Sequence, residues 1–280
     1  MNNEYKEFRK LSYPYLVWLL TLVFIPFLIL VSLSFLNIEG VDYFESSFTL
    51  NNLKNLTEPA ILTAITNSLK YAVTTTFICA VLGYIISYSI FKSNFKNKFL
   101  ITTLFIIPMW TNLLLRSYAL SNILRPQNLL MDILSKIGIN FSIDLIGTDF
   151  AIVLGLVSTY LPFMILPIYN ALEKIEKSVE EASLDLGATE FITFWKVIFP
   201  LSFKGIVTGS ILVFLPALSG FAIPKIMSDG NIVMIGNIIE ESFIQMNYGF
   251  GSLLAVLLLI VILGLMYVAM KVDKEGESFI

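Results

Sequence analysis

The residues of this chain that could do chemistry are most concentrated in one segment, Glu181–Pro200, which reads EASLDLGATEFITFWKVIFP. The segment is a charged island between two apolar runs, each long enough to cross a membrane. It combines acidic groups, small residues and aromatic rings. Small residues permit a close approach, aromatic rings fill apolar pockets, and charged groups make polar contacts at the rim of an interface. The sequence therefore predicts that this segment docks noncovalently onto another surface.

A second set of residues has the side chains that a solute pathway through a membrane needs. Aromatic faces attract cations, and polar groups at membrane depth are costly, so their presence there indicates a function. The candidates are Trp110, Asn112, Arg116, Tyr160, Ser219 and Phe221. The aromatic members could equally form the belt at the membrane–water interface. Arg116 would repel a cation, so we expect it to pair with an acidic residue or to line a gate.

The composition predicts a membrane protein as the scaffold for these two sets. Hydrophobic residues make up 56% of the 280 residues and charged residues 14%, where a soluble domain carries about 25% charged residues. There is no histidine, which removes the usual general base and imidazole metal ligand. The net charge of -3 argues against a nucleic-acid-binding face. We expect one all-α transmembrane domain over residues 1–280, embedded in lipid, without a catalytic or metal site.

Six runs of about 20 apolar residues predict six transmembrane helices. They cover residues 13–35, 66–91, 99–118, 150–172, 203–223 and 249–270. Pro108 interrupts the third of them, and Arg116 lies at its far end. The sequence also predicts a short surface helix over residues 128–138, and a segment over residues 223–248 that dips partly into the membrane.

The placement of lysine and arginine predicts the orientation. With a cytoplasmic N-terminus, twelve of the 18 lysine and arginine residues lie on the cytoplasmic side, mostly in short loops. Both termini and the loop over residues 173–200 are therefore expected in the cytoplasm.

The 173–200 loop has the spacing of two short amphipathic helices. In the first, one helical face would carry the apolar residues Ile175, Val179, Ala182 and Leu186. Gly187 follows where a helix end requires a positive φ, and Thr189 can cap a second helix. The second apolar face would carry Phe191, Phe194, Trp195 and Ile198. Pro200 is expected to bend the chain toward the fifth span.

Three surfaces could receive this loop. Helices that lie on lipid are typically basic, because the cytoplasmic leaflet is anionic. In this loop six acidic residues outnumber three lysines, so lipid is a poor partner. The loop could also fold back on the helix ends of its own chain. A groove on a separate cytoplasmic protein fits an apolar ridge with an acidic flank better than either.

The spacing of this loop resembles a family signature. It is similar to the EAA motif of ABC importer permeases, which begins here with Glu181, Ala182 and Ser183. Gly187 follows after three residues, and residues 197–200, which end in Pro200, follow after nine more. The family pattern has alanine where Ser183 stands, isoleucine for Val197 and leucine for Phe199.

The resemblance extends over most of the chain. Residues 67–73, 108–120, 161–175 and 235–243 are similar to spermidine/putrescine importer permeases, and most like their B-type subunit. Many relatives carry an acidic residue where Gly220 stands here. A carboxylate that could face a cationic substrate is missing at this position.

The resemblance implies a type I ABC importer permease, a multi-pass protein of the bacterial plasma (inner) membrane that forms half of a translocation pathway. The implied partners are a second homologous permease, two copies of a cytoplasmic ATPase and an extracytoplasmic substrate-binding protein. Residues Glu181, Ala182, Ser183, Gly187, Ala188 and Pro200 would couple to the ATPase. No G-x-x-x-x-G-K-[ST] loop is present, so we expect ATP and Mg²⁺ to be used by the ATPase and no cofactor to be bound here.

Two alternatives stay open. The chain could be the permease of a related ABC importer for phosphonate, thiamine or ferric ion. A secondary transporter would need ionisable groups at the centres of the spans, which are almost free of aspartate and glutamate here.

Overall fold

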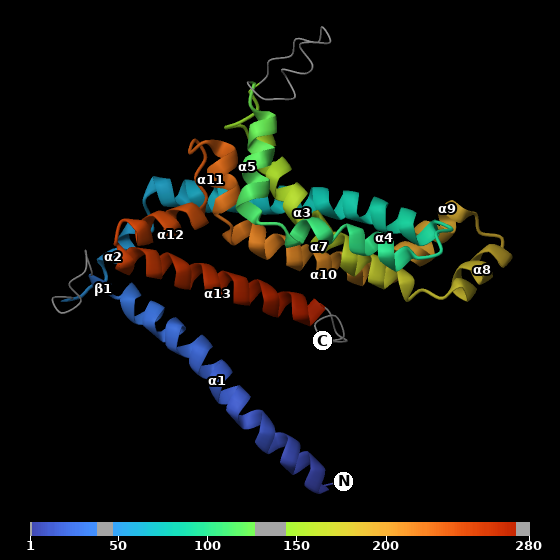
Figure 1. The fold of residues 1–280 in the computed structure, drawn as a ribbon, viewed down its shortest axis with the longest axis horizontal. Helices are drawn as coiled ribbons and strands as arrows, with labels where there is room; N and C mark the ends of the chain where they lie inside the picture. The colour runs from blue at the N-terminus through green and yellow to red at the C-terminus, as the bar shows by residue number, and fades with distance from the viewer. Residues whose placement is uncertain (1, 38–46, 127–143, 273–280) are drawn as a thin grey trace. The chain divides into compact units, whose positions relative to one another are not determined.

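A computed structural model describes residues 2–37, 47–126 and 144–272, and these residues are predominantly helical (Figure 1). The five longest helices are α1 (Asn2–Ser34), α3 (Pro59–Lys92), α7 (Asp149–Glu173), α10 (Phe199–Ser219) and α13 (Tyr248–Val272). The shorter ones are α2 (Asn51–Asn55), α4 (Lys98–Leu104), α5 (Leu113–Leu124), α8 (Lys177–Asp185), α9 (Glu190–Thr193), α11 (Ala222–Ser228) and α12 (Ile235–Ile244). Two strands, β1 (Leu36–Asn37) and β2 (Ser47–Phe48), pair antiparallel. The helix predicted for residues 128–138 lies outside the described residues.

Five helices within the described ranges are long and apolar enough to cross a membrane. They are Tyr13–Ser34, Pro59–Lys92, Asp149–Glu173, Glu190–Ser219 and Tyr248–Tyr267. A sixth span results if the bent pair Leu100–Trp110 and Leu113–Leu124 counts as one. The prediction of an all-α membrane fold is therefore confirmed. The segment predicted to dip into the membrane, residues 223–248, contains α11 and α12, which are too short to span.

The third predicted span, residues 99–118, is not one helix. It consists of α4, a short 3-10 turn η2 (Ile107–Trp110) and α5, with a bend of 90°. Pro108 lies in η2, where its ring removes a backbone donor. The side chain of Asn112 then caps the N-terminus of α5. The interruption predicted at Pro108 is confirmed, because Pro108 lies where one helix ends and Asn112 begins the next.

The chain forms two compact units by internal packing. Unit one combines the described residues within 1–62 and 238–261, and unit two combines those within 63–237 and 262–272. In unit one, the side chain of Asn52 donates to the carbonyl oxygens of Ser34 at 3.1 Å and Leu36 at 3.3 Å. These bonds attach α2 to the end of α1 and to β1.

Unit two is built around α7, whose buried face carries residues that are 0% exposed. They are Ala151, Ile152, Leu156, Met164, Ile165, Ile168 and Leu172. Helix α10 packs along α7 through Gly205 and Gly209, which lie four residues apart. A Cβ atom at Gly205 would come within 2.6 Å of the Pro167 carbonyl oxygen, and one at Gly209 within 2.6 Å of the Met164 sulfur. Small residues allow this close backbone approach, so α7 and α10 form one tightly packed pair.

Candidate functional site

The 173–200 loop folds as two short helices around a left-handed glycine. Helix α8 ends at Asp185, and Gly187 has φ +84°. The Gly187 amide donates to the Leu184 carbonyl at 2.9 Å, and the Ala188 amide donates to the Ser183 carbonyl at 3.2 Å. This pair of bonds is a Schellman motif, in which a positive φ favours glycine. The predicted role of Gly187 in ending the first helix is confirmed.

The second short helix begins as the sequence predicts. The Thr189 hydroxyl accepts from the Ile192 amide at 3.3 Å, which caps α9. Helix α9 then continues through η3 (Phe194–Ile198), a π-helical turn, directly into α10. Residues Glu190–Ser219 are one helix of 30 residues. The predicted bend at Pro200 is not seen, because the helix continues through the proline, directly after the π-helical turn.

A hydroxyl pair that the spacing did not predict joins the two short helices. The Ser183 and Thr193 oxygens lie 2.9 Å apart, and Thr193 is only 1% exposed. Ser183 stands where the EAA motif has its second alanine, so this departure provides a link between α8 and α9. The link and the Schellman motif together fix the angle between the helices.

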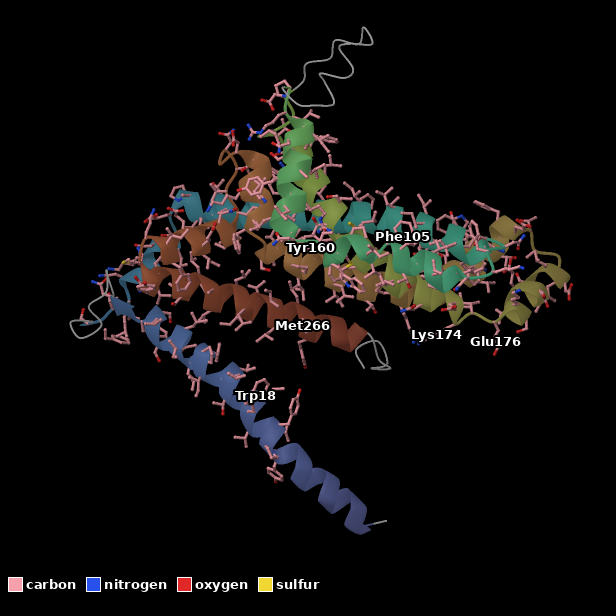
Figure 2. All side chains as sticks on the ribbon, viewed as in Figure 1. Trp18, Phe105, Tyr160, Lys174, Glu176 and Met266 are labelled. Carbon is pink, nitrogen blue, oxygen red and sulfur yellow. The ribbon has the colours of Figure 1, made fainter. Side chains whose placement is uncertain are left out.

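The outer side of the loop is apolar and accessible. Leu186 is 89% exposed, Phe191 71% and Trp195 50%, and Glu181 and Ala182 are also exposed. The predicted second apolar face is only partly correct, because Ile198 is 1% exposed and packs inward. Of the other predicted coupling residues, Ser183 and Ala188 are half-buried and Pro200 is exposed. Figure 2 labels Lys174 and Glu176 in the turn that leads from α7 into α8.

The bend between η2 and α5 brings three of the predicted pathway residues together. The Asn112 side chain accepts from the amides of Leu114 at 2.8 Å and Leu115 at 3.3 Å. The Arg116 guanidinium donates through Nη1 to the Pro108 carbonyl at 2.8 Å. Trp110 is 85% exposed. Asn112 and Arg116 therefore stabilise the bend, and Trp110 projects from it.

Arg116 was expected either to pair with an acidic residue or to line a gate, and none of the ion pairs among the residues that the structure describes includes it. Its hydrogen bond to Pro108 spans the bend, and within the described ranges its buried Nε has no hydrogen-bond partner. The same Pro108 carbonyl also accepts from the Thr111 amide at 3.3 Å and from the Thr111 hydroxyl at 2.6 Å, so three donors converge on this oxygen at the bend. Hydropathy and charge counting could not reveal this contact, since it depends on the 90° turn.

The other three predicted pathway residues lie near the end of α10. The Tyr160 hydroxyl donates to the Pro216 carbonyl at 3.3 Å, and Figure 2 shows Tyr160 on α7 where α5 crosses it. Ser219 donates to the Leu215 carbonyl at 3.0 Å, and Phe221 is 44% exposed. A Cβ at Gly220 would meet the Pro216 carbonyl at 2.9 Å and the Tyr160 hydroxyl at 3.5 Å. Any side chain at Gly220 would therefore require Pro216 to shift.

A polar cluster at the start of α7 was not predicted from the sequence. Asp149 accepts a hydrogen bond from the Tyr71 hydroxyl at 2.5 Å and forms an ion pair with Lys70. Asp229 pairs with Arg125 at 3.3 Å. These partners are 78 to 104 residues apart in sequence, so no local pattern indicates them. Within the described part of the chain, no three histidine, cysteine or acidic residues are grouped to hold a metal.

A family model described as "Binding-protein-dependent transport system inner membrane component" matches residues 79–272. The chain is 34% identical over 271 residues to the spermidine/putrescine transport system permease protein PotB of Haemophilus influenzae, covering 96% of this chain and 95% of the relative. It is 36% identical over 251 residues to PotB of Escherichia coli K12, covering 89% and 91%.

Two solved structures share the fold. A bacterial ABC transporter involved in the import of alginate matches with a TM-score of 0.73 at 13% identity, covering 94% of this chain and 95% of the other. The MetNI methionine ABC transporter in an inward-facing conformation matches with a TM-score of 0.59 at 17% identity, covering 77% and 95%. The expected type I ABC importer permease fold is confirmed.

Proposed function

Because the chain belongs to the family of binding-protein-dependent transport system inner membrane components, we propose that it forms half of the pathway of an ATP-driven polyamine importer. The observation that supports this most is the identity of 34% to 36% with spermidine/putrescine permeases over nearly the whole chain. The chain is a multi-pass protein of the bacterial inner membrane, and its relatives are transport subunits rather than enzymes. A second, homologous permease would complete the pathway.

The 173–200 loop is the proposed docking site for a cytoplasmic ATPase, two copies of which would serve the permease pair. Glu181 and Ala182 are exposed beside Leu186, which suits contact with a groove. Ser183, Gly187 and Ala188 hold the turn, and Pro200 lies where the loop enters α10. ATP and Mg²⁺ would be bound by the ATPase, since this chain has no phosphate-binding loop of the G-x-x-x-x-G-K-[ST] type.

The loop would transmit the closure of the ATPase dimer to the membrane. It is continuous with α7 at one end and with α10 at the other. Close packing at Gly205 and Gly209 makes these two helices a pair. A displacement of the loop would therefore tilt both helices together. This tilt would switch the pathway from being open to the inside to being open to the outside.

The proposed substrate is a flexible polycation, delivered by an extracytoplasmic binding protein. Trp110 offers an exposed aromatic face of the kind that attracts ammonium groups, and Tyr160 and Phe221 lie near the end of α10. Arg116 directs its guanidinium at Pro108, so its charge is partly engaged within the bend. These residues are candidates for the pathway lining, together with Asn112 and Ser219.

Reconstitution tests this function. The chain, its partner permease, the ATPase and the binding protein are placed in proteoliposomes, and uptake of spermidine and putrescine is compared with that of phosphonate, thiamine and ferric ion. We expect polyamine uptake that requires internal ATP and the binding protein. Uptake of another solute, but not of polyamine, would reject the polyamine assignment. Polyamine uptake driven by an ion gradient without the ATPase would indicate a secondary transporter instead.

A further inference from the structure

Helix α3 meets the 173–200 loop at a cluster of aromatic rings, which we call the aromatic joint. It consists of Tyr84 and Tyr88 of α3, Phe194 of η3 and Phe199 of α10. The Phe194 ring lies edge-on to Tyr88 with centroids 4.9 Å apart, and edge-on to Tyr84 at 5.8 Å. The Tyr84 and Phe199 centroids are 5.4 Å apart. These edge-to-face distances are favourable for aromatic pairs.

Two polar contacts lie on either side of the joint. The Tyr84 hydroxyl and the Ser202 hydroxyl are 2.9 Å apart, and their residues are 8% and 0% exposed. Lys92, at the end of α3, forms an ion pair with Glu180 of α8. Figure 1 shows the end of α3 beside α9 at the same end of unit two as α8. Helix α3 is therefore attached to α8, to η3 and to α10.

Helix α3 is also bound to α7. The Ser87 hydroxyl donates to the Ile165 carbonyl at 2.9 Å within the buried interface. A Cβ at Gly83 would come within 2.8 Å of the Met164 side chain, so the two helices lie close. The same segment of α3, residues 83–92, thus contacts both helices that the loop would move.

The backbone has an uncommon conformation at the joint. Residues Phe194–Ile198 form a π-helical turn, and Thr193 and Ile198 at its two ends are each 1% exposed. Single π-turns within α-helices are rare and occur frequently at functional sites. Here the wide turn carries the Phe194 ring to Tyr84 and Tyr88.

We infer that the aromatic joint makes α3 a third moving element, so that the loop displaces α3 together with α7 and α10. This inference rests on the proposed ATPase-coupling function. If the loop slid past α3 instead, the buried Tyr84 hydroxyl would lose its partner among apolar groups, which is unfavourable. Tyr84 and Tyr88 are thus positioning residues, because they act on the pathway through α3 without contacting substrate.

A cross-link tests whether the loop and α3 move together. Lys92→Cys and Glu180→Cys are combined in a Cys79→Ala background and joined with a short bismaleimide in the assembled transporter. Because the two positions move as one body, we expect ATP-dependent uptake to stay at the level of the untreated double variant. Loss of uptake on cross-linking would overturn the inference, since it would mean that the loop must move against α3.

Substitution of the joint provides a second readout. In the double variant Tyr84→Ala with Tyr88→Ala, we expect the amount of substrate transported per ATP to fall by roughly tenfold, the factor that corresponds to about 1.4 kcal/mol of lost coupling. Tyr84→Phe keeps the ring, so the amount of substrate transported per ATP should fall less in this variant. The matched control is Phe77→Ala, which removes a ring that is 69% exposed on the same helix. Equal transport per ATP in the double variant and the control would overturn the inference.

A further variant separates this inference from the proposed function. Ala182→Trp places a bulky residue on the exposed side of α8 and should abolish coupling through the docking surface itself. If Ala182→Trp abolishes transport while the tyrosine variants transport normally, the joint is rejected and the proposed function stands. If the Ala182→Trp variant and the tyrosine variants all transport normally, both the joint and the docking function are rejected.

Discussion

At the scale of single residues, Gly187 determines the geometry of the 173–200 loop through its backbone alone. Its φ of +84° lies in the left-handed region, and a Cβ there would meet nothing within 4 Å. Packing would thus admit a larger residue, whereas the backbone conformation disfavours most residues other than glycine and asparagine. Ser183 adds a side-chain link, since its hydroxyl lies 2.9 Å from that of Thr193.

Gly187→Val should therefore disrupt the loop. A side chain in the left-handed conformation costs about 1–2 kcal/mol, and a β-branched one is especially unfavourable there. We expect ATPase activity that binding protein no longer stimulates, with normal membrane insertion. Gly187→Asn is the matched control, because asparagine tolerates this conformation and should keep most of the stimulation. Equal stimulation in both variants would show that the positive φ is not required for coupling.

Arg116 has a different role from the one that its charge suggests. Its Nη1 bond to the Pro108 carbonyl stabilises the bend, so Arg116→Gln should lower the melting temperature of the detergent-solubilised chain. Hydrogen bonds of charged groups contribute about 1.5–3 kcal/mol to the free energy of unfolding, so we expect the variant to lose an amount of this order. Uptake kinetics give the second measurement. An unchanged melting temperature together with a lower KM for polyamine would show that Arg116 repels the substrate instead.

At the scale of helices, the pairing of α7 with α10 depends on Gly205. A Cβ there would lie 2.6 Å from the Pro167 carbonyl and 2.8 Å from the Ala171 side chain, so Gly205→Leu must separate the helices. We expect a loss of stability of about 1–3 kcal/mol or more, measured by thermal unfolding in detergent. Gly264→Leu is the matched control, because Gly264 is also in a membrane helix but has nothing within 4 Å of its Cβ position. Equal melting temperatures for the two variants would contradict the close packing.

The sequence predicted those helical features that depend on neighbouring residues. Gly187 and Thr189 were found because a helix end and a helix start have local signals, and apolar runs are read directly from composition. Pro108 marked the interruption in the third span, but the 90° change of direction was not predicted, because hydropathy measures how apolar a segment is and not the direction in which it runs. The contacts of Tyr84 with Ser202 and of Lys92 with Glu180 join residues that are 118 and 88 apart. Such contacts follow from tertiary packing, which one sequence does not specify by pattern.

At the scale of the whole molecule, the docking proposal depends on whether the bent pair crosses the membrane. Five unbroken helices and this pair are the candidate spans among the described residues. If the N-terminus is cytoplasmic and the pair crosses, the 173–200 loop follows four crossings and lies in the cytoplasm. If the pair enters and leaves on one side, the loop follows three crossings and lies outside, where no cytoplasmic ATPase could reach it.

Single cysteines placed in the Cys79→Ala background decide between these topologies. Leu186→Cys reports on the loop, Asn94→Cys on the segment before α4 and Asp144→Cys on the segment before α7. With a membrane-impermeant maleimide added to intact cells, we expect Asp144→Cys to react, and the other two to react only after permeabilisation. The positive-inside distribution of charges and the docking role both require this pattern. Protection of Asp144→Cys together with reaction of Leu186→Cys would mean that the pair is re-entrant. The exposed Leu186, Phe191 and Trp195 would then face the extracytoplasmic side, and the coupling function would have to be assigned to another loop.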